Sequence, residues 1–506
     1  MPKALAILGT SSDVGKSLIT AGLGRLLFWK GINVVPFKSQ NMSLNSFVTV
    51  EGGEMGRAQV LQAHACGLLP HVDMNPILLK PEADHSSQVI VQGKVWGRHD
   101  AKGYFGCRPE LFRYVRESYD RLAARHDMII IEGAGSAAEV NLRDRDLVNW
   151  PVVEMADASV ILVADIDRGG VFAQILGTLD LLEPHERRRV MGVIVNKFRG
   201  DRRLFDDGVQ ILEDRGRVPV LGVVPFMRQL ELDQEDSVTV DPHDAQPYSA
   251  NTINLAVVLL PHMSNFTDFN ALAAEEDVVL HYIKRPEELD GADVVILPGT
   301  KNTIGDLRYL RNMGFDEKIH TRVLKKTGEL MGLCGGFQML GKIVSDPWNV
   351  EEGGEIQGLG VLEMTSELLR NKQTTQVTAR SLFLSDSWDC DVRGYEIHMG
   401  LTQRLAGSPC FEIVKRQNVR NGEPSEDGVV SIDGLVWGTY LHGVFDQPGF
   451  RRTWLNRIRG RKGLLPLDVS VSQAVSDRLV EALNRWAEHL DQHMQVSRIF
   501  SHFDMK

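Results

Sequence analysis

The sequence predicts an α/β protein with two doubly wound, mostly parallel-sheet domains and a C-terminal helix. Short β-branched runs of strand length alternate with amphipathic stretches of helix length, and this alternation occurs in two separate series along the 506-residue chain. Strands that alternate with helices are expected to be parallel and covered on both faces. A chain of this length is also expected to form two or three domains.

The first series of strands predicts a domain over residues 1–228. Its expected strands are short apolar runs with turn residues nearby, at 4–8, 34–37, 128–131, 160–164, 191–195 and 220–224. The amphipathic stretch 18–29 predicts a helix that ends at Gly31. Residues 229–251 are rich in Asp, Glu, Gln, Ser and Pro without clear periodicity, so we expect them to form the linker.

The second series predicts another α/β domain over residues 252–450. Its expected strands lie at 253–260, 278–282, 294–297, 329–333 and 435–440. Residues 451–506 are expected to form a helical tail. Apolar side chains recur there at spacings of three and four from Val471 to Leu490, which is typical of one buried face of a packing helix.

Composition excludes several classes of function. The chain carries 56 Lys and Arg against 67 Asp and Glu, a net charge of −11, which disfavours nucleic-acid binding. The apolar runs are of strand length and the N-terminus lacks the pattern of a signal peptide, so we expect a cytoplasmic protein without membrane spans. The 5 cysteines form no CxxC pair, so neither a disulfide framework nor a zinc site is indicated.

A loop suited to phosphate follows the first predicted strand. It reads Gly9-Thr10-Ser11-Ser12-Asp13-Val14-Gly15-Lys16-Ser17 and precedes the predicted helix. Successive backbone N–H groups and the positive end of a helix hold a phosphate well. Lys16 adds a mobile cation for the β- and γ-phosphates of ATP, and the Ser17 hydroxyl suits Mg²⁺. Thr10 stands at the first glycine position of the usual pattern, and Thr10, Asp13 and Gly15 are also expected to contact ATP.

Two carboxylates are candidates for holding the magnesium ion together with Ser17. Glu132 directly follows the third predicted strand, and ligands of open α/β sheets bind at this carboxyl edge. Asp13 lies in the phosphate loop itself. Lys38 closes the second predicted strand and is a candidate for reaching the transferring phosphate, although spacing alone does not distinguish it from a surface lysine.

The phosphate loop and the later Glu132-Gly133-Ala134-Gly135 resemble dethiobiotin synthetase and related amidoligases. The resemblance implies that ATP activates a carboxylate as an acyl phosphate. Partition-type ATPases, which dimerise around ATP, carry a lysine where this sequence has Ser11. By the same resemblance Asn196, which is followed by Lys197, belongs to a turn that recognises adenine.

A candidate nucleophile lies in the second domain, at Gly332-Leu333-Cys334-Gly335-Gly336-Phe337-Gln338. Glycines around a reactive residue permit a sharp strand-to-helix turn that lifts the Cys334 thiol clear of the sheet, near a helix N-terminus. His442, just after another predicted strand, is the candidate base. The backbone N–H groups of Gly335 and of the loop containing Gly299 are expected to form an oxyanion hole.

The pattern Gly-x-Cys-x-Gly-x-Gln with a downstream histidine resembles class I glutamine amidotransferases. The resemblance implies that Cys334 attacks the glutamine amide and releases ammonia, and that Gln338 lies in the glutamine pocket. The usual triad ends in His-x-Glu, but here His442 is followed by Gly443 and Val444. Either another residue orients His442, or the site works as a dyad.

Over nearly its whole length the sequence resembles the cobyric acid synthase family. Four long segments in the order of the family carry the resemblance, at 37–46, 75–81, 164–172 and 394–400. The resemblance implies that ATP, Mg²⁺ and L-glutamine serve to amidate the b, d, e and g carboxylates of a corrinoid, adenosylcobyrinic acid a,c-diamide. The product is adenosylcobyric acid, on the route to adenosylcobalamin. Arg57, Gln59 and Lys80 are candidates for contacting the corrinoid.

Three alternatives stay open. The a,c-diamide synthases of cobyrinic acid share both modules, although the Gln-Asn-Met-Ser signature at 40–43 favours the cobyric acid synthases. A nucleotide-switched binding protein with an inactive glutaminase-like domain is disfavoured by Ser11 and by the intact Cys334. A stand-alone glutaminase leaves the Lys16 loop unexplained. For segment 394–400, a conformationally demanding turn and a role in lining the glutamine pocket or the domain interface are equally supported.

Overall fold

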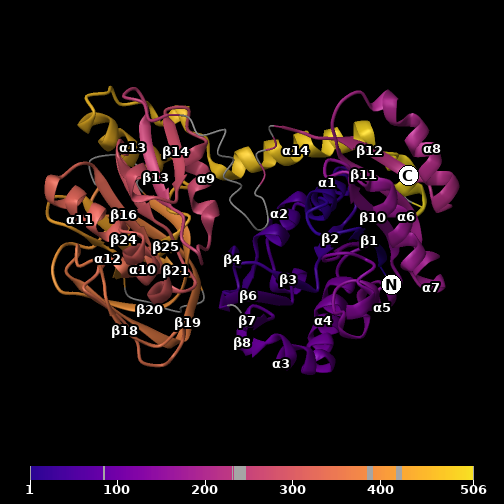
Figure 1. Ribbon diagram of the computed structural model, residues 1–506, viewed down its shortest axis with the longest axis horizontal. Coiled ribbons are helices and arrows are strands. Elements are labelled where there is room, and N and C mark those ends of the chain that lie inside the picture. The colour runs from indigo at the N-terminus through magenta and orange to yellow at the C-terminus, as the bar shows by residue number, and fades with distance from the viewer. Residues whose placement is uncertain are drawn as a thin grey trace.

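The computed structural model describes residues 2–83, 86–228, 230, 232, 247–384, 391–417 and 424–504. Most of the expected linker at 229–251 and Cys390 lie outside these residues. The described chain forms two lobes, which Figure 1 shows side by side, with the long helix α14 (Val475–His493) running from one to the other. Within the described part of the chain, no helix combines the length and the apolar character needed to cross a membrane.

The first lobe is built on a six-stranded parallel sheet in the order β12-β11-β10-β1-β9-β2. Its strands are β1 (Lys3–Gly9), β2 (Val34–Phe37), β9 (Met128–Glu132), β10 (Ser159–Asp165), β11 (Val190–Phe198) and β12 (Val220–Pro225). The six strands expected from the sequence are therefore confirmed. They read as continuous apolar runs because both faces of the sheet are buried.

Helices cover both faces of this sheet. They are α1 (Lys16–Trp29), α2 (Arg57–Ala65), α4 (Arg108–Ala123), α5 (Trp150–Met155), α6 (Val171–Leu181), α7 (Pro184–Arg187) and α8 (Asp206–Gly216), with short 3₁₀ turns η1 (Val72–Met74), η2 (Val140–Arg145) and η3 (Arg202–Phe205). α3 (Ala101–Gly106) packs instead beside α4 and the strand at 94–100. α1 confirms the helix expected near its bounds. The first lobe thus has the doubly wound architecture expected of it.

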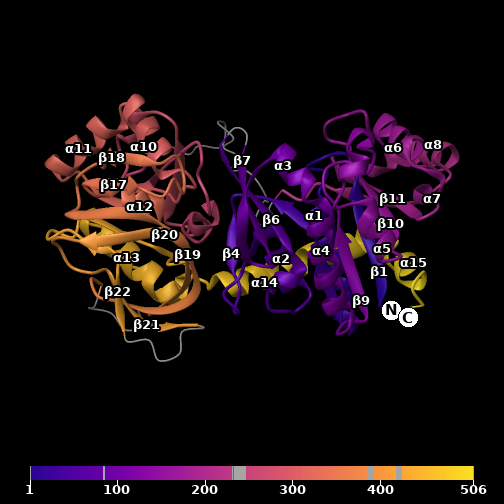
Figure 2. The ribbon, with the colours of Figure 1, turned by 90° about the horizontal axis from the view of Figure 1, so that it is seen from below.

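An insertion between β2 and β9 was not expected from the sequence. It contains the sheet β3-β6-β7-β8 and the hairpin β4–β5. The bounds are β3 (Gln40–Met42), β4 (Ser46–Val48), β5 (Glu54–Gly56), β6 (Ile77–Ala83), β7 (Ser86–Val91) and β8 (Lys94–Asp100). This insertion lies on the side of the first lobe that faces the second lobe, as Figure 2 shows.

The second lobe contains a mostly parallel sheet in the order β14-β13-β15-β16-β24-β23. Its strands are β13 (Ile253–Val258), β14 (Val278–Ile283), β15 (Val294–Leu297), β16 (Glu329–Leu333), β23 (Val429–Val430) and β24 (Val436–Thr439). Around it lie α9 (Asn270–Ala273), α10 (Thr303–Asn312), α11 (Phe315–Lys325), α12 (Gly335–Leu340), α13 (Pro448–Arg461), and the 3₁₀ turns η4 (Phe266–Phe269) and η5 (Pro286–Leu289).

A second sheet of this lobe follows the order β18-β17-β19-β20-β25. In addition, β21 pairs with β19, and β22 pairs with β21. Its strands are β17 (Ile343–Asp346), β18 (Gly354–Gln357), β19 (Met364–Ser381), β20 (Asp391–Arg404), β21 (Phe411–Arg416), β22 (Ser425–Asp427) and β25 (Leu441–His442). Segment 394–400 lies inside β20, so its interpretation as a turn is wrong. Its glycines relieve crowding instead, because a Cβ on Gly394 would lie 2.2 Å from the His442 carbonyl oxygen.

The C-terminal helices return the chain to the first lobe. α14 packs on α1, and Trp486 Nε1 donates to the Leu18 carbonyl at 2.7 Å. After α15 (Val496–Ser501), the end of the described chain lies near its beginning, where Lys3 Nζ bonds the Phe503 carbonyl. α13 spans residue 450, and the domain boundaries of the sequence analysis stay predictions.

Candidate functional sites

The phosphate loop joins β1 to α1 in the first lobe. Gly15 takes a left-handed conformation with φ of 99°, which glycine adopts without strain. The loop folds back over Lys16, whose Nζ donates to the carbonyls of Ser11 at 2.9 Å and Gly135 at 3.0 Å. Lys16 is only 7% exposed. The lysine is therefore held inside the loop, at the carboxyl edge of the sheet where the sequence predicts the phosphates.

Asn196, at the carboxyl end of β11, packs directly against this loop. Its Nδ2 donates to the Val14 carbonyl at 2.8 Å, and a Cβ on Gly15 would lie 2.2 Å from the same nitrogen. Thr10 Oγ1 donates to Gln174 Oε1 at 3.3 Å. The structure thus brings Thr10, Gly15, Lys16 and Asn196 together, as expected for residues that share one nucleotide.

Glu132 is the centre of a buried polar cluster at the carboxyl ends of β9 and β2. Its Oε1 accepts from Ser17 Oγ at 2.7 Å and from Lys38 Nζ at 2.8 Å. Its Oε2 accepts from Gln59 Nε2 at 3.2 Å and from Gln62 Nε2 at 2.5 Å. Glu132 is 0% exposed and Lys38 4% exposed, so neither is a solvated surface residue.

Sequence reasoning missed the part played by α2 in this cluster. Gln59 and Gln62 lie one turn apart on the same face of the helix. Their spacing in the sequence indicates a role only when α2 is known to pack beside Glu132. Gln59 is fully buried and also accepts from Asn41 Nδ2 at 3.0 Å. Lys80 is also buried, and its Nζ donates to Ser46 Oγ and to Glu54 Oε1.

Asp13 is placed apart from this cluster. Its side chain is 67% exposed and pairs with Arg168 at 3.3 Å. Its backbone carbonyl accepts from Lys197 Nζ at 2.6 Å, and the same amine contacts Asp165 at 2.9 Å. Ser17 and Glu132 thus contact each other, whereas Asp13 contacts Arg168 and Lys197. Its roles in ATP and metal binding stay predictions.

The candidate nucleophile stands at a sharp turn between β16 and α12. Cys334 has φ of 49° and ψ of −108°, a strained conformation for a residue with a Cβ. The flanking glycines leave no room for larger residues, since a Cβ on Gly336 would lie 2.1 Å from the Leu297 carbonyl oxygen. Cys334 remains partly exposed, at the N-terminus of α12. This geometry presents the thiol as a nucleophile elbow does.

The two proposed oxyanion donors lie on neighbouring loops. A Cβ on Gly335 would lie 3.2 Å from the backbone nitrogen of Thr300, so the loop after β15 meets the start of α12. Gly299 in that loop lies against the imidazole, where its Cβ would be 3.4 Å from His442 Cε1. The structure therefore gathers Gly299, Gly335 and His442 around Cys334.

Asp268 supplies the acid that the sequence pattern lacks. His442 Nδ1 bonds Asp268 Oδ2 at 2.6 Å, and Asp268 Oδ1 accepts from the Gly443 N–H at 2.9 Å. Both side chains are buried. Burial lowers the pKa of His442, but the charge and hydrogen bond of Asp268 and the neighbouring Cys334 outweigh it and raise the pKa to about 10. Of the two possibilities left open, the structure supports a separate residue that orients His442.

No motif marked Asp268 in the sequence, because it precedes His442 by 174 residues. It lies in η4, after β13, the first strand of the mostly parallel sheet of the second lobe. The only available signal is its place: a carboxylate that follows a predicted strand reaches the same carboxyl edge as Cys334 and His442.

Gln338 is buried beneath the thiol and its amide is held at both ends. Thr303 Oγ1 donates to Gln338 Oε1 at 3.0 Å, and Gln338 Nε2 donates to the Tyr440 hydroxyl at 3.1 Å. His398 stacks on the Tyr440 ring, with centroids 3.9 Å apart. These contacts fix the wall beside Cys334, and a direct contact between Gln338 and a substrate stays a prediction.

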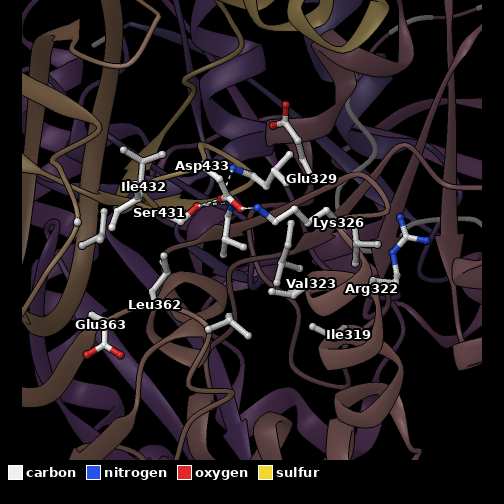
Figure 3. A pocket seen from close by; sticks show the side chains of 18 of the residues that line it. Ile319, Arg322, Val323, Lys326, Glu329, Leu362, Glu363, Ser431, Ile432 and Asp433 are labelled. Atoms are coloured by element: carbon white, nitrogen blue, oxygen red, sulfur yellow. Dashed lines mark hydrogen bonds and ion pairs between the residues drawn. The ribbon is translucent and has the colours of Figure 1, made fainter. Parts of the chain in front are cut away.

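A separate cavity of about 450 Å³ opens on the second lobe. Figure 3 shows Glu329, Lys326 and Asp433 around it, with Lys326 and Asp433 paired at 3.1 Å. Glu329 begins β16, whereas Cys334 follows its last residue. The cavity therefore lies at the opposite end of the strands from the thiol, away from the edge where ligands of such sheets bind.

Comparisons with known proteins give a match for each lobe. Residues 5–240 match the CobQ/CobB/MinD/ParA nucleotide binding domain, and residues 254–450 match the CobB/CobQ-like glutamine amidotransferase domain. A cobyric acid synthase of Syntrophobacter fumaroxidans is 49% identical, over 98% of this chain and 98% of its own. Cobyric acid synthases of Klebsiella pneumoniae and Salmonella arizonae are 47% and 46% identical, each over 99% of this chain and 98% of their own.

Proposed function

Because the chain belongs to the cobyric acid synthase family, we propose that it amidates the b, d, e and g carboxylates of adenosylcobyrinic acid a,c-diamide. ATP and glutamine are the co-substrates, and adenosylcobyric acid is the product. The observation that supports the proposal is the presence of two candidate sites on one chain: the phosphate loop beside Glu132, and Cys334 in the lobe that holds the His442–Asp268 pair. We expect the reaction to take place in the cytoplasm.

In the first lobe, a corrinoid carboxylate oxygen attacks the γ-phosphorus of ATP, which forms an acyl phosphate and releases ADP. Lys16 and Lys38 are positioned to balance the negative charge of the transferring phosphoryl group. The buried neighbours of Lys38 hold its amine at the carboxyl edge of the sheet. The backbone of the phosphate loop and the N-terminus of α1 hold the remaining phosphate oxygens.

A magnesium ion fits the chemistry of this cluster. The Ser17 hydroxyl and the Glu132 carboxylate are oxygen donors in direct contact, which is the ligand type that Mg²⁺ prefers. These two residues would hold it, and the ion would offset charge on the phosphates of ATP. Among the described residues, no cluster of three or more His, Cys, Asp or Glu side chains offers an all-protein metal site. We therefore expect oxygens of the nucleotide to complete the coordination of the ion.

In the second lobe, His442 takes the thiol proton of Cys334, and the sulfur attacks the glutamine amide carbon. The N–H groups of Gly335 and Gly299 stabilise the oxyanion. The imidazolium returns the proton to the departing nitrogen, and a thioester remains. Water hydrolyses the thioester to glutamate. The released ammonia attacks the acyl phosphate in the first lobe, which forms the amide and expels phosphate.

Replacing the nucleophile separates the two halves of the reaction. In Cys334→Ser we expect glutamine-dependent amidation to fall by about 10³-fold or more, because the serine hydroxyl is a far weaker nucleophile. Amidation supported by ammonium chloride should persist, because the first lobe is intact. Loss of both activities in a folded variant would contradict the division of labour between the lobes, and retention of both would remove Cys334 from the mechanism.

A further inference from the structure

The first lobe contacts the surroundings of the His442–Asp268 pair of the second lobe at two places. Figure 2 shows β4 of the first lobe facing β19 and β20 of the second. One contact is with the loop that carries Asp268, and the other is with the ring that covers His442. Neither contact belongs to the thiol chemistry itself, so their role lies outside the mechanism described above.

On the first side, Asn45 and Ser46 hold the start of η4. The Asn45 side-chain oxygen accepts from the Phe266 N–H at 3.2 Å. In return, the Ser46 N–H donates to Asn265 Oδ1 at 3.0 Å. Asn265 has φ of 53°, and its Nδ2 lies 3.4 Å from His442 Nδ1. These reciprocal bonds between lobes fix the turn that delivers Asp268 to the imidazole.

On the other side, Arg57 holds the ring that covers His442. The Tyr395 ring lies nearly parallel to the imidazole, with centroids 5.3 Å apart and an interplanar angle of 15°. Arg57 donates to the Tyr395 hydroxyl at 3.1 Å, and its guanidinium lies 5.7 Å from the Tyr395 centroid and 5.3 Å from that of Phe47. The cation thus fixes Tyr395 by a hydrogen bond and by cation–π contacts.

Arg57 also begins the helix that reaches the nucleotide site. It is the first residue of α2, and Gln59 and Gln62 of the same helix donate to Glu132. The first two turns of α2 therefore contact both the ring that covers the glutaminase base and the carboxylate proposed to hold Mg²⁺. A displacement of this short helix would shift both contacts together, because a helix moves as a rigid element.

We propose that Arg57 and Asn45 are positioning residues through which the first lobe sets the geometry of the glutaminase base, with α2 linking that geometry to the nucleotide site. The inference rests on the proposed function. It assigns to first-lobe residues an effect on ammonia production in the second lobe.

The test uses the full-length enzyme and two assays. One measures glutamate release from glutamine in the presence of ATP, Mg²⁺ and the corrinoid, and the other measures amidation supported by ammonium chloride. In Arg57→Met we expect kcat for glutamine hydrolysis to fall by about 10- to 100-fold, since small misplacements of catalytic groups have effects of this size. The KM for glutamine should change far less, and ammonia-supported amidation should fall far less than glutamine hydrolysis.

Further variants exclude a merely structural effect. Arg57→Lys keeps the charge and should restore part of the lost kcat, and Asn45→Ala should reproduce the loss through the other contact. Thr374→Val is the matched control, because Thr374 Oγ1 donates across the lobes to the Gly52 carbonyl at 2.9 Å without contacting Tyr395 or His442. It should leave both assays within about 2-fold of the wild type, as expected for a rim hydrogen bond.

Each outcome decides the inference. Equal loss of both activities in Arg57→Met, with a raised KM for the corrinoid in the ammonia assay, would overturn it and make Arg57 a substrate contact. Unchanged glutamine hydrolysis in both Arg57→Met and Asn45→Ala would also overturn it. Failure of the wild-type enzyme to amidate the corrinoid with glutamine would instead refute the proposed function.

Discussion

His442 owes its protonation behaviour to a residue that no local motif contains. Asp268 binds its Nδ1 at 2.6 Å, so Nε2 is the nitrogen left to exchange a proton with Cys334. A buried carboxylate beside an imidazole favours the imidazolium, and this in turn favours the thiolate. The absent His-x-Glu acid is thus replaced in space rather than lost, and we expect full glutaminase chemistry from this chain.

Asp268→Asn tests this replacement. The amide keeps the shape of the side chain but removes the charge that stabilises the imidazolium, so we predict that kcat for glutamine hydrolysis falls by about 10²- to 10⁴-fold. Amidation supported by ammonium chloride should stay near the wild-type rate, and the two rates are compared in parallel. A variant that hydrolyses glutamine at the wild-type rate would show that Cys334 and His442 act as a dyad.

The His442–Asp268 pair makes the free energy of unfolding depend on pH. The pKa of His442 is raised to about 10 in the folded protein, against about 6.5 in an unfolded chain. Its contribution to stability is therefore complete below the unfolded pKa and is lost as pH rises toward the folded pKa. Between pH ~7 and ~9 we predict a steeper loss of unfolding free energy in the wild type than in Asp268→Asn, by at most ~1.4 kcal/mol per pH unit. Parallel pH profiles from urea unfolding would contradict this.

At the scale of elements, the strand ends β2 and β9 hold the buried Lys38–Glu132 pair of the nucleotide site. Lys38→Met leaves a buried carboxylate without its counter-charge, which destabilises a protein by about 3–5 kcal/mol. Adding Glu132→Gln removes that charge, so we predict that the double variant regains much of the stability without regaining ATP-dependent activity. Equal stability of the single variant and the wild type in urea unfolding would argue against a charged buried pair.

The helix α14 is the element that joins the tail to the phosphate-binding helix. Leu490 is fully buried beside Gly22 of α1, where a Cβ on Gly22 would lie 2.3 Å from Leu490 Cδ1. We predict that Leu490→Ala destabilises the first lobe by about 2–5 kcal/mol and weakens nucleotide binding, because α1 carries Lys16 and Ser17. Leu465→Ala, at an 81% exposed position, is the control. Matching denaturation midpoints and nucleotide affinities in the two variants would refute this role of α14.

The elements that the sequence predicts are those with a strong local pattern. The strands of both parallel sheets are continuous apolar runs, so β1, β2, β9 and their counterparts in the second lobe were predictable. The strands β3, β4 and β5 are only three residues long, and the long hairpin β19–β20 is rich in polar residues, so none of them has the continuous apolar run that marks the parallel strands. For segment 394–400 the glycines left a turn and a role in lining the pocket or interface equally supported, and only the structure shows that Gly394 accommodates the neighbouring strand β25.

The same distinction holds for the two sites. Lys16, Ser17 and Cys334 stand in contiguous motifs whose chemistry depends on neighbours in sequence, so spacing alone is enough to propose them as site residues. Asp268 and Gln62 act on partners far along the chain, so only the folded structure brings them to His442 and Glu132.

At the scale of the whole molecule, buried charges tie the lobes together. Glu54 of the first lobe pairs with Lys80 of the same lobe and with Lys372 of the second. Burial raises the pKa of Glu54, but the two lysines outweigh it and hold that pKa far below its usual range. Lys301 of the second lobe similarly pairs with Glu82 at 2.7 Å. We expect such desolvated pairs to specify how the lobes dock, which suits the proposal that ammonia is made in one lobe and used in the other.

The most direct test of the account is to follow the corrinoid itself. The purified enzyme would be incubated with ATP, Mg²⁺, adenosylcobyrinic acid a,c-diamide and glutamine labelled with nitrogen-15 at the side-chain amide, and the product would be weighed by mass spectrometry. The account predicts one heavy nitrogen at each of the b, d, e and g positions. An unchanged a,c-diamide, with cobyrinic acid amidated in its place, would contradict the account and assign the chain to a,c-diamide synthesis.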